Sequence, residues 1–248
     1  MVEPMNDIAV IGAGYWGRNL VRNVSALGRL SMICDASEAI RSKMAGLYPS
    51  VRITSTLEGV LNNPDVKGIM IAVPSKAHAE VARQGLLAGK HVYVEKPITL
   101  DGDEADELCE LAEKHNLELM VGHLLLYHPC VRWIKESISK GEIGDVLYLN
   151  SVRVNLGKVR SDENAMWSLA PHDISVALYL LEAEPTSVAA QGLCYVQKDR
   201  NIHDVAFITL RFADGTAAQI HVSWLDPHKK RQLTVVGREK MLTFDDTS

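Results

Sequence analysis

The sequence lacks the features that mark several large classes of protein. No apolar run among its 248 residues approaches the roughly 20 needed to span a bilayer, and no signal peptide precedes the first expected strand. Its 26 Lys and Arg are outnumbered by 31 Asp and Glu, for a net charge of −5, and the one compact basic run, residues 228–231, is interpreted as a solvated turn. Nucleic-acid binding needs clustered positive charge against the phosphates. We therefore expect a cytoplasmic protein without a membrane or nucleic-acid partner.

Cysteine is sparse and scattered. The four cysteines show no C-x-x-C pair and no spacing typical of a metal site, so we interpret them as reduced thiols in a cytoplasmic protein. His123 and His128 flank an apolar run with no third ligand at metal-binding spacing, which favours structural roles for both. The sequence therefore predicts no metal site.

The first half of the chain alternates short apolar runs with amphipathic stretches of helical period. This rhythm is typical of β-α-β units and a parallel sheet. It predicts one open, doubly wound Rossmann sheet over residues 1–122. The expected strands cover residues 7–11, 30–34, 51–54, 66–73, 90–95 and 118–121, and the expected helices cover residues 14–27, 37–47, 57–61, 76–88 and 103–115.

After Gly122 the rhythm changes. Helical patterns and a polar connection come first, and the period then falls to two, which is typical of antiparallel strands. Asp214-Gly215 predicts a tight hairpin turn. We expect residues 123–248 to form an α+β domain with a mainly antiparallel open sheet. The expected helices cover residues 129–140 and 172–181, the polar connection 155–164, and the strands 145–153, 187–197, 205–212, 216–223, 232–236 and 241–244.

The pattern G-x-G-x-x-G follows the first expected strand and opens the first expected helix. In this context Gly12 allows a tight turn, Gly14 lets the backbone approach a pyrophosphate, and Gly17 lets helix and strand pack closely. Tyr15 and Trp16 belong to the same expected cofactor-binding loop. The alternative interpretation is three turn glycines without a ligand.

Asp35 ends the second expected strand, 18 residues after Gly17. An acidic side chain at this place accepts hydrogen bonds from the ribose hydroxyls of NAD and repels the extra phosphate of NADP. We therefore expect NAD, with NADP as the alternative because Ser37 and Arg41 are close enough in sequence to accommodate that phosphate. A turn or helix-capping role for Asp35 is the other interpretation.

Further candidates fall at the ends of two other expected strands. Pro74 ends the fourth strand, at the sheet edge where a dinucleotide lies, and His78 follows with either a structural or a cofactor-binding role. Glu95 and Lys96 end the fifth strand. A lysine at that edge can hydrogen-bond a substrate hydroxyl and stabilise the alkoxide that forms as hydride leaves, or it is a plain surface lysine.

Together these motifs resemble the glucose–fructose oxidoreductase/inositol dehydrogenase (Gfo/Idh/MocA) family. The similarity rests on the glycine pattern, Asp35, A-V-P-S-x-x-H at residues 72–78 and E-K-P at residues 95–97. The resemblance implies a Rossmann domain followed by an α+β domain whose open sheet often forms the oligomer interface. It also implies that Lys96 is the catalytic lysine, that Pro74, His78 and Glu95 lie at the cofactor, and that the bond after Lys96 is cis.

The second motif of this family places a catalytic histidine at the start of a helix, four residues after an aspartate. His172 takes the place of that histidine, and an imidazole can take the hydroxyl proton as hydride departs. Ser168 stands where the family has the aspartate, which departs from the pattern. Asp173 offers another way to orient His172, and its alternative role is a first-turn aspartate stabilised by the helix dipole.

A narrower resemblance, carried by residues 122–129, 155–160 and 164–173, is to nucleotide-sugar 3-dehydrogenases, which oxidise the C3 hydroxyl of a UDP-N-acetylhexosamine. Basic residues in the connection suit a diphosphate or are plain loop charges. Aromatic residues can pack on a sugar face, although Trp167 also suits a core position. The expected substrate site comprises Lys96, Tyr127, Lys158, Arg160, Asn164, Trp167, Ser168, His172 and Asp173.

The sequence therefore predicts an NAD-dependent sugar dehydrogenase with Lys96 and His172 as the acid/base pair and a nucleotide sugar as substrate. One alternative is a dehydrogenase of a free sugar or polyol such as an inositol, which needs no diphosphate site. Another is a non-catalytic NAD-binding module. We expect a homo-oligomer formed through the second sheet.

The resemblance also bears on length. Chains of this family normally continue past a strand such as residues 241–244 into more sheet and a helix that packs toward the Rossmann domain. We therefore expect a C-terminally shortened protein or a fragment, whose exposed sheet is completed or masked by a partner subunit.

Overall fold

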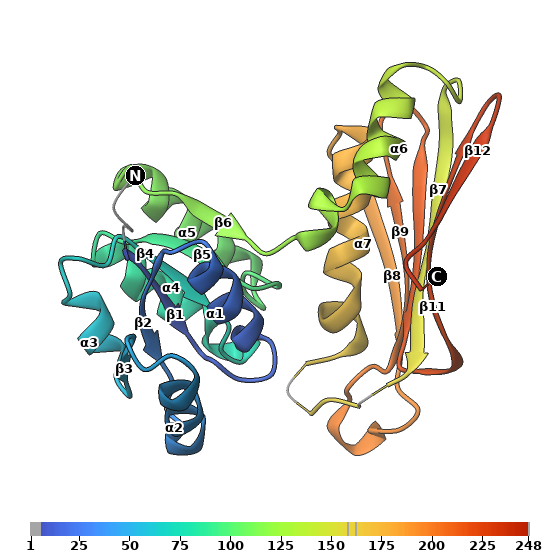
Figure 1. Ribbon diagram of the computed structural model, residues 1–248. Helices are drawn as coiled ribbons and strands as arrows, with labels where there is room; N and C mark the ends of the chain where they lie inside the picture. The colour runs from blue at the N-terminus through green and yellow to red at the C-terminus, as the bar shows by residue number, and fades with distance from the viewer. Residues whose placement is uncertain (1–5, 158, 162, 248) are drawn as a thin grey trace. The chain divides into compact units, whose positions relative to one another are not determined.

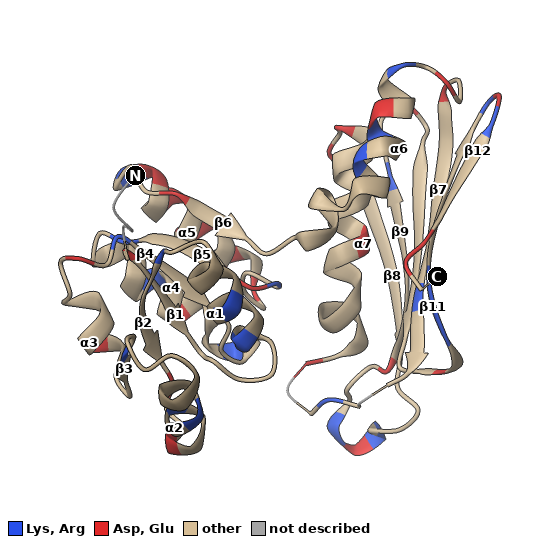
Figure 2. Cartoon of the chain, viewed as in Figure 1, with Lys and Arg blue, Asp and Glu red and all other residues tan. Residues whose placement is uncertain are grey.

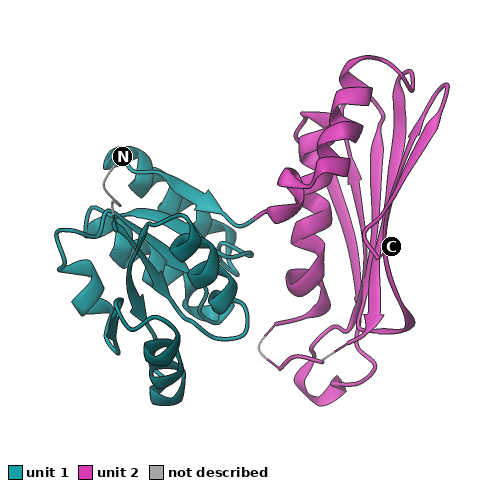
Figure 3. Ribbon diagram, viewed as in Figure 1, with its two compact units in different colours: residues 1–122 teal, residues 123–248 magenta. Residues whose placement is uncertain are grey.

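The computed structural model describes residues 6–157, 159–161 and 163–247. The chain divides into two compact units, Met1–Gly122 and His123–Ser248 (Figure 3). Each unit has its own six-stranded sheet and its own apolar core. The expected fold class, a Rossmann sheet followed by a mainly antiparallel sheet, is confirmed.

The first unit is a parallel sheet flanked by helices (Figure 1). Its strand order is β3-β2-β1-β4-β5-β6, the order of a doubly wound nucleotide-binding sheet. The chain therefore crosses from one side of β1 to the other, which leaves the crevice for a ligand at the carboxyl ends of the strands. The elements are β1 (Ile8–Ile11), α1 (Gly17–Ala26), β2 (Leu30–Cys34), α2 (Glu38–Leu47), β3 (Arg52–Thr54), α3 (Leu57–Leu61), β4 (Gly68–Ile71), η1 (Ser75–Ala77), α4 (His78–Leu87), β5 (His91–Val94), α5 (Gly102–Lys114) and β6 (Leu119–Val121).

Both faces of the first sheet are buried. Successive residues of β1 point to opposite faces: Val10 joins a cluster with Leu20 of α1, whereas Ile11 joins one with Leu86 of α4 and Leu108 of α5. Near-continuous apolar strands are expected when helices cover both faces. Each fully buried leucine contributes roughly 1.5–3 kcal/mol. This two-sided core is a rigid base for the loops at the strand ends.

The second unit is a mixed sheet with its two helices on one face (Figure 1). The strand order is β12-β11-β7-β10-β9-β8, and neighbouring strands are antiparallel except β7 and β10. The elements are η2 (Leu124–Tyr127), α6 (Pro129–Ser139), β7 (Val146–Leu156), α7 (Ala165–Leu181), β8 (Ser187–Leu193), η3 (Lys198–Arg200), β9 (Val205–Arg211), β10 (Ala217–Ser223), β11 (Leu225–Gly237) and β12 (Met241–Asp245).

The two faces of the second sheet differ in character. Inward-facing Ile208 and Ile220 pack in the same core as Val176 of α7. On the other face Phe207 is 44% exposed and stacks on His221 of the neighbouring strand, with ring centroids 4.4 Å apart. Within the described residues of this unit, no helix lies on that outward face. The outward face therefore presents this aromatic pair, beside the polar pair Thr209 and Gln219, to solvent in the single chain.

Helix α7 begins seven residues earlier than expected. The expected start at residue 172 is wrong: the helix begins at Ala165, where Asn164 Oδ1 accepts a hydrogen bond from the Trp167 amide at 3.0 Å. Pro171 lies inside the helix, although proline normally ends or kinks one because it lacks an amide donor. Burial of Ala165 on the core side shows why the helix persists: tertiary packing outweighs the cost of the proline.

Strand boundaries in the second unit also differ from expectation. Strand β7 runs to Leu156, into the expected polar connection, and β11 spans Leu225–Gly237 rather than 232–236. The basic run at residues 228–231 lies within β11, so its assignment to a turn is wrong. The register of β11 against β7 shifts between Leu225 and Lys230, which a short periodic pattern does not reveal.

Charged side chains of both signs are interspersed over the elements of both units (Figure 2).

Among the helices in the described part of the chain, none combines the length and apolar character needed to cross a membrane.

Candidate active site

The loop between β1 and α1 has the geometry of a phosphate-binding turn. Gly12 has φ of +84°, and a Cβ added there would lie 2.7 Å from the carbonyl oxygen of Ala72. A Cβ on Gly17 would lie 1.8 Å from the carbonyl oxygen of Gly12, whereas one on Gly14 would meet nothing within 4 Å. Two positions are therefore closed to any side chain and the third is open to a ligand. The loop fits the pyrophosphate of a dinucleotide at the head of a helix.

Asp35 directly follows β2 and is held beside this loop. Its Oδ2 accepts a hydrogen bond from the Ala13 amide, and its Oδ1 accepts one from the Ser37 amide, both at 2.8 Å. Arg41 Nη1 donates to the carbonyl oxygens of Asp35 at 2.9 Å and Ala36 at 2.7 Å. The carboxylate thus closes a turn and is fixed at the edge where a ribose would lie, so the two interpretations of Asp35 are compatible.

Cys34, at the end of β2, lies beside this carboxylate. Burial, together with the negative charge of Asp35, raises the pKa of its thiol to about 11. The thiol is therefore an inert apolar neighbour of the loop rather than a nucleophile.

Tyr15 and Trp16 occupy the same loop but differ in their contacts. Tyr15 is 84% exposed, with the Arg18 guanidinium 5.1 Å from its ring centroid. Trp16 is the N-cap residue of α1, and its indole Nε1 donates a hydrogen bond to Glu95 Oε1 at 2.6 Å. Trp16 therefore joins the glycine loop to the end of β5.

Lys96 lies after β5, at the carboxyl end of the parallel sheet. The peptide bond between Lys96 and Pro97 is cis, as expected. The adjacent Glu95 is buried, and its Oε1 also accepts a hydrogen bond from the Tyr93 hydroxyl at 2.8 Å. Lys96 is thus placed on the ligand-binding edge of the sheet by a buried neighbour.

His78 opens α4 and is 2% exposed. Its Nδ1 lies 2.7 Å from the carbonyl oxygen of Pro97, and its Nε2 lies 2.9 Å from the carbonyl oxygen of Val73. Pro74 follows Val73 in the same loop. Both ring nitrogens of His78 therefore contact the backbone of the loops after β4 and β5.

In the second unit, His172 lies in the middle of α7, and its Nδ1 is buried. Ser168 is buried one turn earlier, on the same side of the helix. A first-turn role for Asp173 is wrong, because the helix begins at Ala165.

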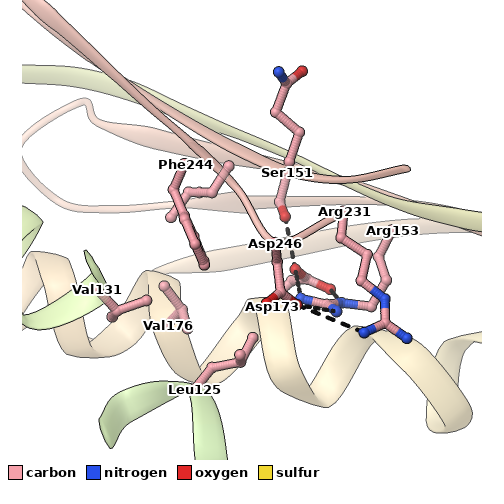
Figure 4. A pocket seen from close by; sticks show the side chains of 11 residues that line it. Leu125, Val131, Ser151, Arg153, Asp173, Val176, Arg231, Phe244 and Asp246 are labelled. Atoms are coloured by element: carbon pink, nitrogen blue, oxygen red, sulfur yellow. Dashed lines mark hydrogen bonds and ion pairs between the residues drawn. The ribbon is translucent and has the colours of Figure 1, made fainter. Parts of the chain in front are cut away.

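The carboxylate of Asp173 points to the sheet (Figure 4). Its Oδ2 accepts a hydrogen bond from Arg153 Nε at 2.8 Å, and its Oδ1 accepts bonds from Arg153 Nη2 at 3.2 Å and Ser151 Oγ at 2.7 Å. Adjacent residues of a helix do not face each other. Asp173 therefore lies on a different side of α7 from His172 and joins the helix to β7.

Three of the expected sugar and phosphate contacts, Arg160, Asn164 and Trp167, lie at or just before the start of α7. Arg160 has a side chain 48% exposed, and its Nη1 pairs with Glu163 Oε1 at 2.7 Å. Asn164 caps the helix, Trp167 is half-buried in its first turn, and Tyr127 of η2 is 56% exposed. Lys158 lies outside the described residues. Because Arg160 is paired with Glu163, a diphosphate would have to compete with the Glu163 carboxylate for the guanidinium or share the guanidinium with it.

Sequence reasoning did not find Tyr93, Gly122, Ser151 or Arg153 as parts of these arrangements. A Cβ added at Gly122 would lie 2.4 Å from the Tyr93 hydroxyl oxygen, so this glycine makes room for the Tyr93 contact with Glu95. Arg153 lies at an inward-facing position of β7, in a strand whose residues alternate between the two faces of the sheet. A charged residue at a position that the alternation assigns to the core is the sequence signal that could have indicated a buried partner.

Known families match the same two parts of the chain. A family model described as the oxidoreductase family with an NAD-binding Rossmann fold matches residues 7–123, and the GFO/IDH/MocA C-terminal domain matches residues 131–243. The two matches together span most of the chain.

Three relatives illustrate the range of names in this group. The uncharacterised oxidoreductase YrbE of Bacillus subtilis is 30% identical over 221 residues, covering 85% of this chain and 65% of YrbE. UDP-N-acetylglucosamine 3-dehydrogenase of Acidithiobacillus ferrooxidans is 29% identical over 242 residues, covering 95% of this chain and 72% of that enzyme. Inositol 2-dehydrogenase of Rhizobium meliloti is 27% identical, covering 85% and 66%. The chain spans about two thirds of the length of these relatives.

Solved structures agree with the sequence matches. GenD2 from gentamicin A biosynthesis, in complex with NAD, has a TM-score of 0.90 at 25% identity, covering 96% of this chain and 72% of GenD2. The Acidithiobacillus ferrooxidans enzyme has a TM-score of 0.85 at 28% identity, covering 96% and 76%. With the glycine loop and the two-sheet architecture, these matches show that the chain belongs to the GFO/IDH/MocA oxidoreductase family and that its first unit is an NAD-binding Rossmann domain.

Proposed function

We propose that the protein is an NAD-dependent dehydrogenase that oxidises a sugar hydroxyl to a ketone, with C3 of a UDP-N-acetylhexosamine as the reacting carbon. The observation that carries the reaction class is the position of Lys96 at the carboxyl end of β5, in the same sheet edge as an NAD-binding glycine loop. In such sheets ligands bind at that edge.

The reaction needs a hydride acceptor and a place for one proton. NAD, when bound, supplies the hydride acceptor. Lys96 donates a hydrogen bond to the reacting hydroxyl oxygen and stabilises negative charge that develops on it, and His172 takes the hydroxyl proton. The hydrogen on the reacting carbon would leave with both electrons of its C–H bond as hydride, for which bound NAD is the acceptor; the C–O bond would become a carbonyl, and the hydroxyl proton would reside on His172.

The nucleotide-sugar assignment is supported by the similarity of 29% to UDP-N-acetylglucosamine 3-dehydrogenase over 95% of this chain. Arg160, half-exposed before α7, is the group in the described residues that we assign to the diphosphate. Inositol dehydrogenases match at 27% and 25% identity, which favours a free polyol as the second candidate substrate.

The test is a panel of UDP-sugars, free sugars and polyols, assayed with NAD and separately with NADP. Nicotinamide reduction by a UDP-N-acetylhexosamine supports the proposal, and reduction by inositol alone supports the second candidate. Because a relative named 2,7-anhydro-N-acetylneuraminate hydratase matches at 25% identity, substrate loss is followed beside net NADH formation. Substrate loss without NADH formation would contradict a dehydrogenase.

Arg160 separates the two candidate substrates. We expect Arg160→Ala to raise the KM for a UDP-sugar about tenfold or more and to leave that for a free polyol unchanged, because a guanidinium bound to phosphate contributes roughly 1.5–3 kcal/mol. Arg238→Ala is the matched control, since its side chain is 69% exposed in the hairpin between β11 and β12.

The proposal includes a homo-oligomer formed through the outward face of the second sheet. Exposed Tyr148 and Phe207 lie on alternating positions of β7 and β9, and a second copy packed face to face would bury them. Light scattering after size-exclusion chromatography tests this. Phe207→Glu is expected to yield monomers, and a monomeric unmodified protein would contradict the proposal.

A further inference from the structure

Lys96 stands between two residues whose contacts reach far along the sequence. On one side, Glu95 Oε1 accepts hydrogen bonds from Trp16 Nε1 at 2.6 Å and from the Tyr93 hydroxyl at 2.8 Å. On the other side, the carbonyl oxygen of Pro97 lies 2.7 Å from His78 Nδ1. The backbone that carries Lys96 is therefore held on one side through Trp16 and Tyr93 and on the other side through His78.

The contacts to Glu95 converge on a single oxygen atom. A carboxylate oxygen that accepts two donors is a charge-assisted acceptor, which is stronger than a neutral one. Glu95 is 8% exposed, so these bonds form in a region of low dielectric. The strand end is thus fixed by bonds that would be costly to leave unmade.

The residues around Glu95 leave little free space beside its carboxylate. A Cβ at Gly122, after β6, would approach the Tyr93 hydroxyl oxygen to 2.4 Å and Glu95 Cδ to 3.2 Å. Trp16 reaches the same carboxylate from the head of α1, 79 residues away in sequence. The end of β5 is therefore tied to the glycine loop on one side and packed closely against the end of β6 on the other.

His78 ties the lysine segment to a second loop. Its other nitrogen, Nε2, lies 2.9 Å from the carbonyl oxygen of Val73, after β4. His78 is the first residue of α4, and α4 packs on β5. The loops after β4 and β5 are thus linked through one buried ring.

We propose that Glu95, Trp16 and His78 are positioning residues for Lys96, and that the hydrogen bond between Trp16 and Glu95 couples the dinucleotide loop to the placement of the lysine. The proposal rests on the proposed function for the role of Lys96. Trp16 precedes Gly17 at the N-terminus of α1, where a pyrophosphate binds. A cofactor that orders this loop therefore also orders the segment at residues 95–97, before any substrate arrives.

Two substitutions separate the hydrogen bond from the bulk of each side chain. Trp16→Phe keeps an aromatic ring and removes the Nε1 donor. Glu95→Gln keeps an oxygen acceptor where both donors converge and removes the charge, whereas Glu95→Ala removes the acceptor. Trp133→Phe is the matched control, because Trp133 is 55% exposed on α6 in the other unit.

Hydrogen–deuterium exchange of the peptide covering residues 95–99 gives a readout that needs no substrate. In the unmodified protein, saturating NAD should slow this exchange, whereas in Trp16→Phe and Glu95→Ala exchange should be about tenfold faster and respond less to NAD. Glu95→Gln should stay close to the unmodified protein, and Trp133→Phe should match it. Unchanged exchange in both Trp16→Phe and Glu95→Ala would overturn the proposal.

Kinetics and binding complete the test. With a substrate from the panel, Trp16→Phe should lower kcat about tenfold while the Kd for NAD, measured by titration calorimetry, changes less than about threefold. His78→Gln, which keeps one donor, should lower kcat in the same way. If Glu95→Ala or His78→Gln fails to fold, Trp16→Phe alone decides the test, because Trp16 is 41% exposed and its replacement by phenylalanine should not prevent folding. If no sugar is oxidised by the unmodified protein, the proposed function fails, while the exchange data still decide whether the segment is coupled.

Discussion

The two units hold their candidate acid–base residues in different ways. In the first unit, Lys96 follows a strand end whose neighbours are hydrogen-bonded to side chains from α1, β5 and α4. In the second, His172 lies on a long helix that packs in the apolar core and whose Asp173 pairs with buried Arg153 and accepts a hydrogen bond from Ser151 of the sheet. The first arrangement distributes its polar contacts over several side chains, whereas the second concentrates them on one carboxylate. A single substitution at the anchor should therefore do more harm in the second unit.

The largest effect is expected from breaking that ion pair. Arg153→Met leaves the buried carboxylate of Asp173 with its Ser151 hydrogen bond but without its cationic partner, which should lower the free energy of unfolding by about 3–5 kcal/mol. Urea unfolding of the whole protein, followed by tryptophan fluorescence, measures this change.

The double variant Arg153→Met/Asp173→Leu should recover much of the loss, because it removes the uncompensated charge. Arg238→Met breaks an exposed pair with Asp145 and should leave the unfolding curve unchanged. Equal effects of Arg153→Met and Arg238→Met would show that the buried pair is no anchor.

The acid–base assignment is expected to give the next largest effect. Lys96→Ala and His172→Ala should each lower turnover about a hundredfold or more while NAD binding stays intact, because each removes a group that the proposal assigns to the reacting hydroxyl. Steady-state kinetics with calorimetric titration of NAD checks both. Near-normal turnover of Lys96→Ala would remove the lysine from the proposed mechanism.

The outward face of the second sheet gives a smaller, pH-dependent effect. Burial lowers the pKa of His221, and the charge of Asp226 opposes this only in part. Protonation therefore occurs below the ordinary range of histidine and places a positive charge on the face that a second copy would bury, which opposes association. If this face is the interface between copies, the oligomer should dissociate as the pH falls through that range.

Sedimentation across a pH series measures the dissociation. The variant His221→Gln should remain associated at the acidic end, because it carries no titratable ring. A midpoint of dissociation that does not move in His221→Gln would assign the effect to other groups.

The smallest expected effect is a difference in reactivity between the buried thiol beside the glycine loop and the exposed thiols of both units. With a pKa raised to about 11, Cys34 carries about one thiolate in a thousand at pH 8, and its burial also limits access. A thiol reagent should therefore label exposed Cys130 of the second unit, and exposed Cys109, long before Cys34. Peptide mapping by mass spectrometry reports the order, and early labelling of Cys34 would mean that β2 opens readily.

Much of the first unit was predictable because its signals are local. Gly12 requires a positive φ, and the apolar runs that became β1, β4 and β5 lie within a few residues of their expected bounds. The carboxyl ends of parallel strands share one edge, so the placement of both Asp35 and Lys96 at that edge followed from their positions at strand ends. Helices cover both faces of this sheet, so its strands are near-continuous apolar runs that are easy to recognise in the sequence.

The second unit was less predictable because long-range packing decides its elements. Pro171 indicated a helix start, yet α7 runs through it because the helix is buried against β10 and β7. Asp173 suits a first turn in sequence terms, yet its carboxylate pairs with Arg153, 20 residues earlier on β7. No local pattern distinguishes an aspartate at a helix start from one that faces a sheet.

The sequence by itself determined the Rossmann topology, the glycine loop, the position of Lys96 at a strand end and the resemblance to one oxidoreductase family. These depend on backbone geometry and periodicity, which a few neighbouring residues encode. Only the tertiary structure decided that Glu95 binds Trp16, that His78 spans two loops and that Asp173 anchors α7. Those contacts join residues far apart in sequence, and their existence depends on which side chains the fold buries together.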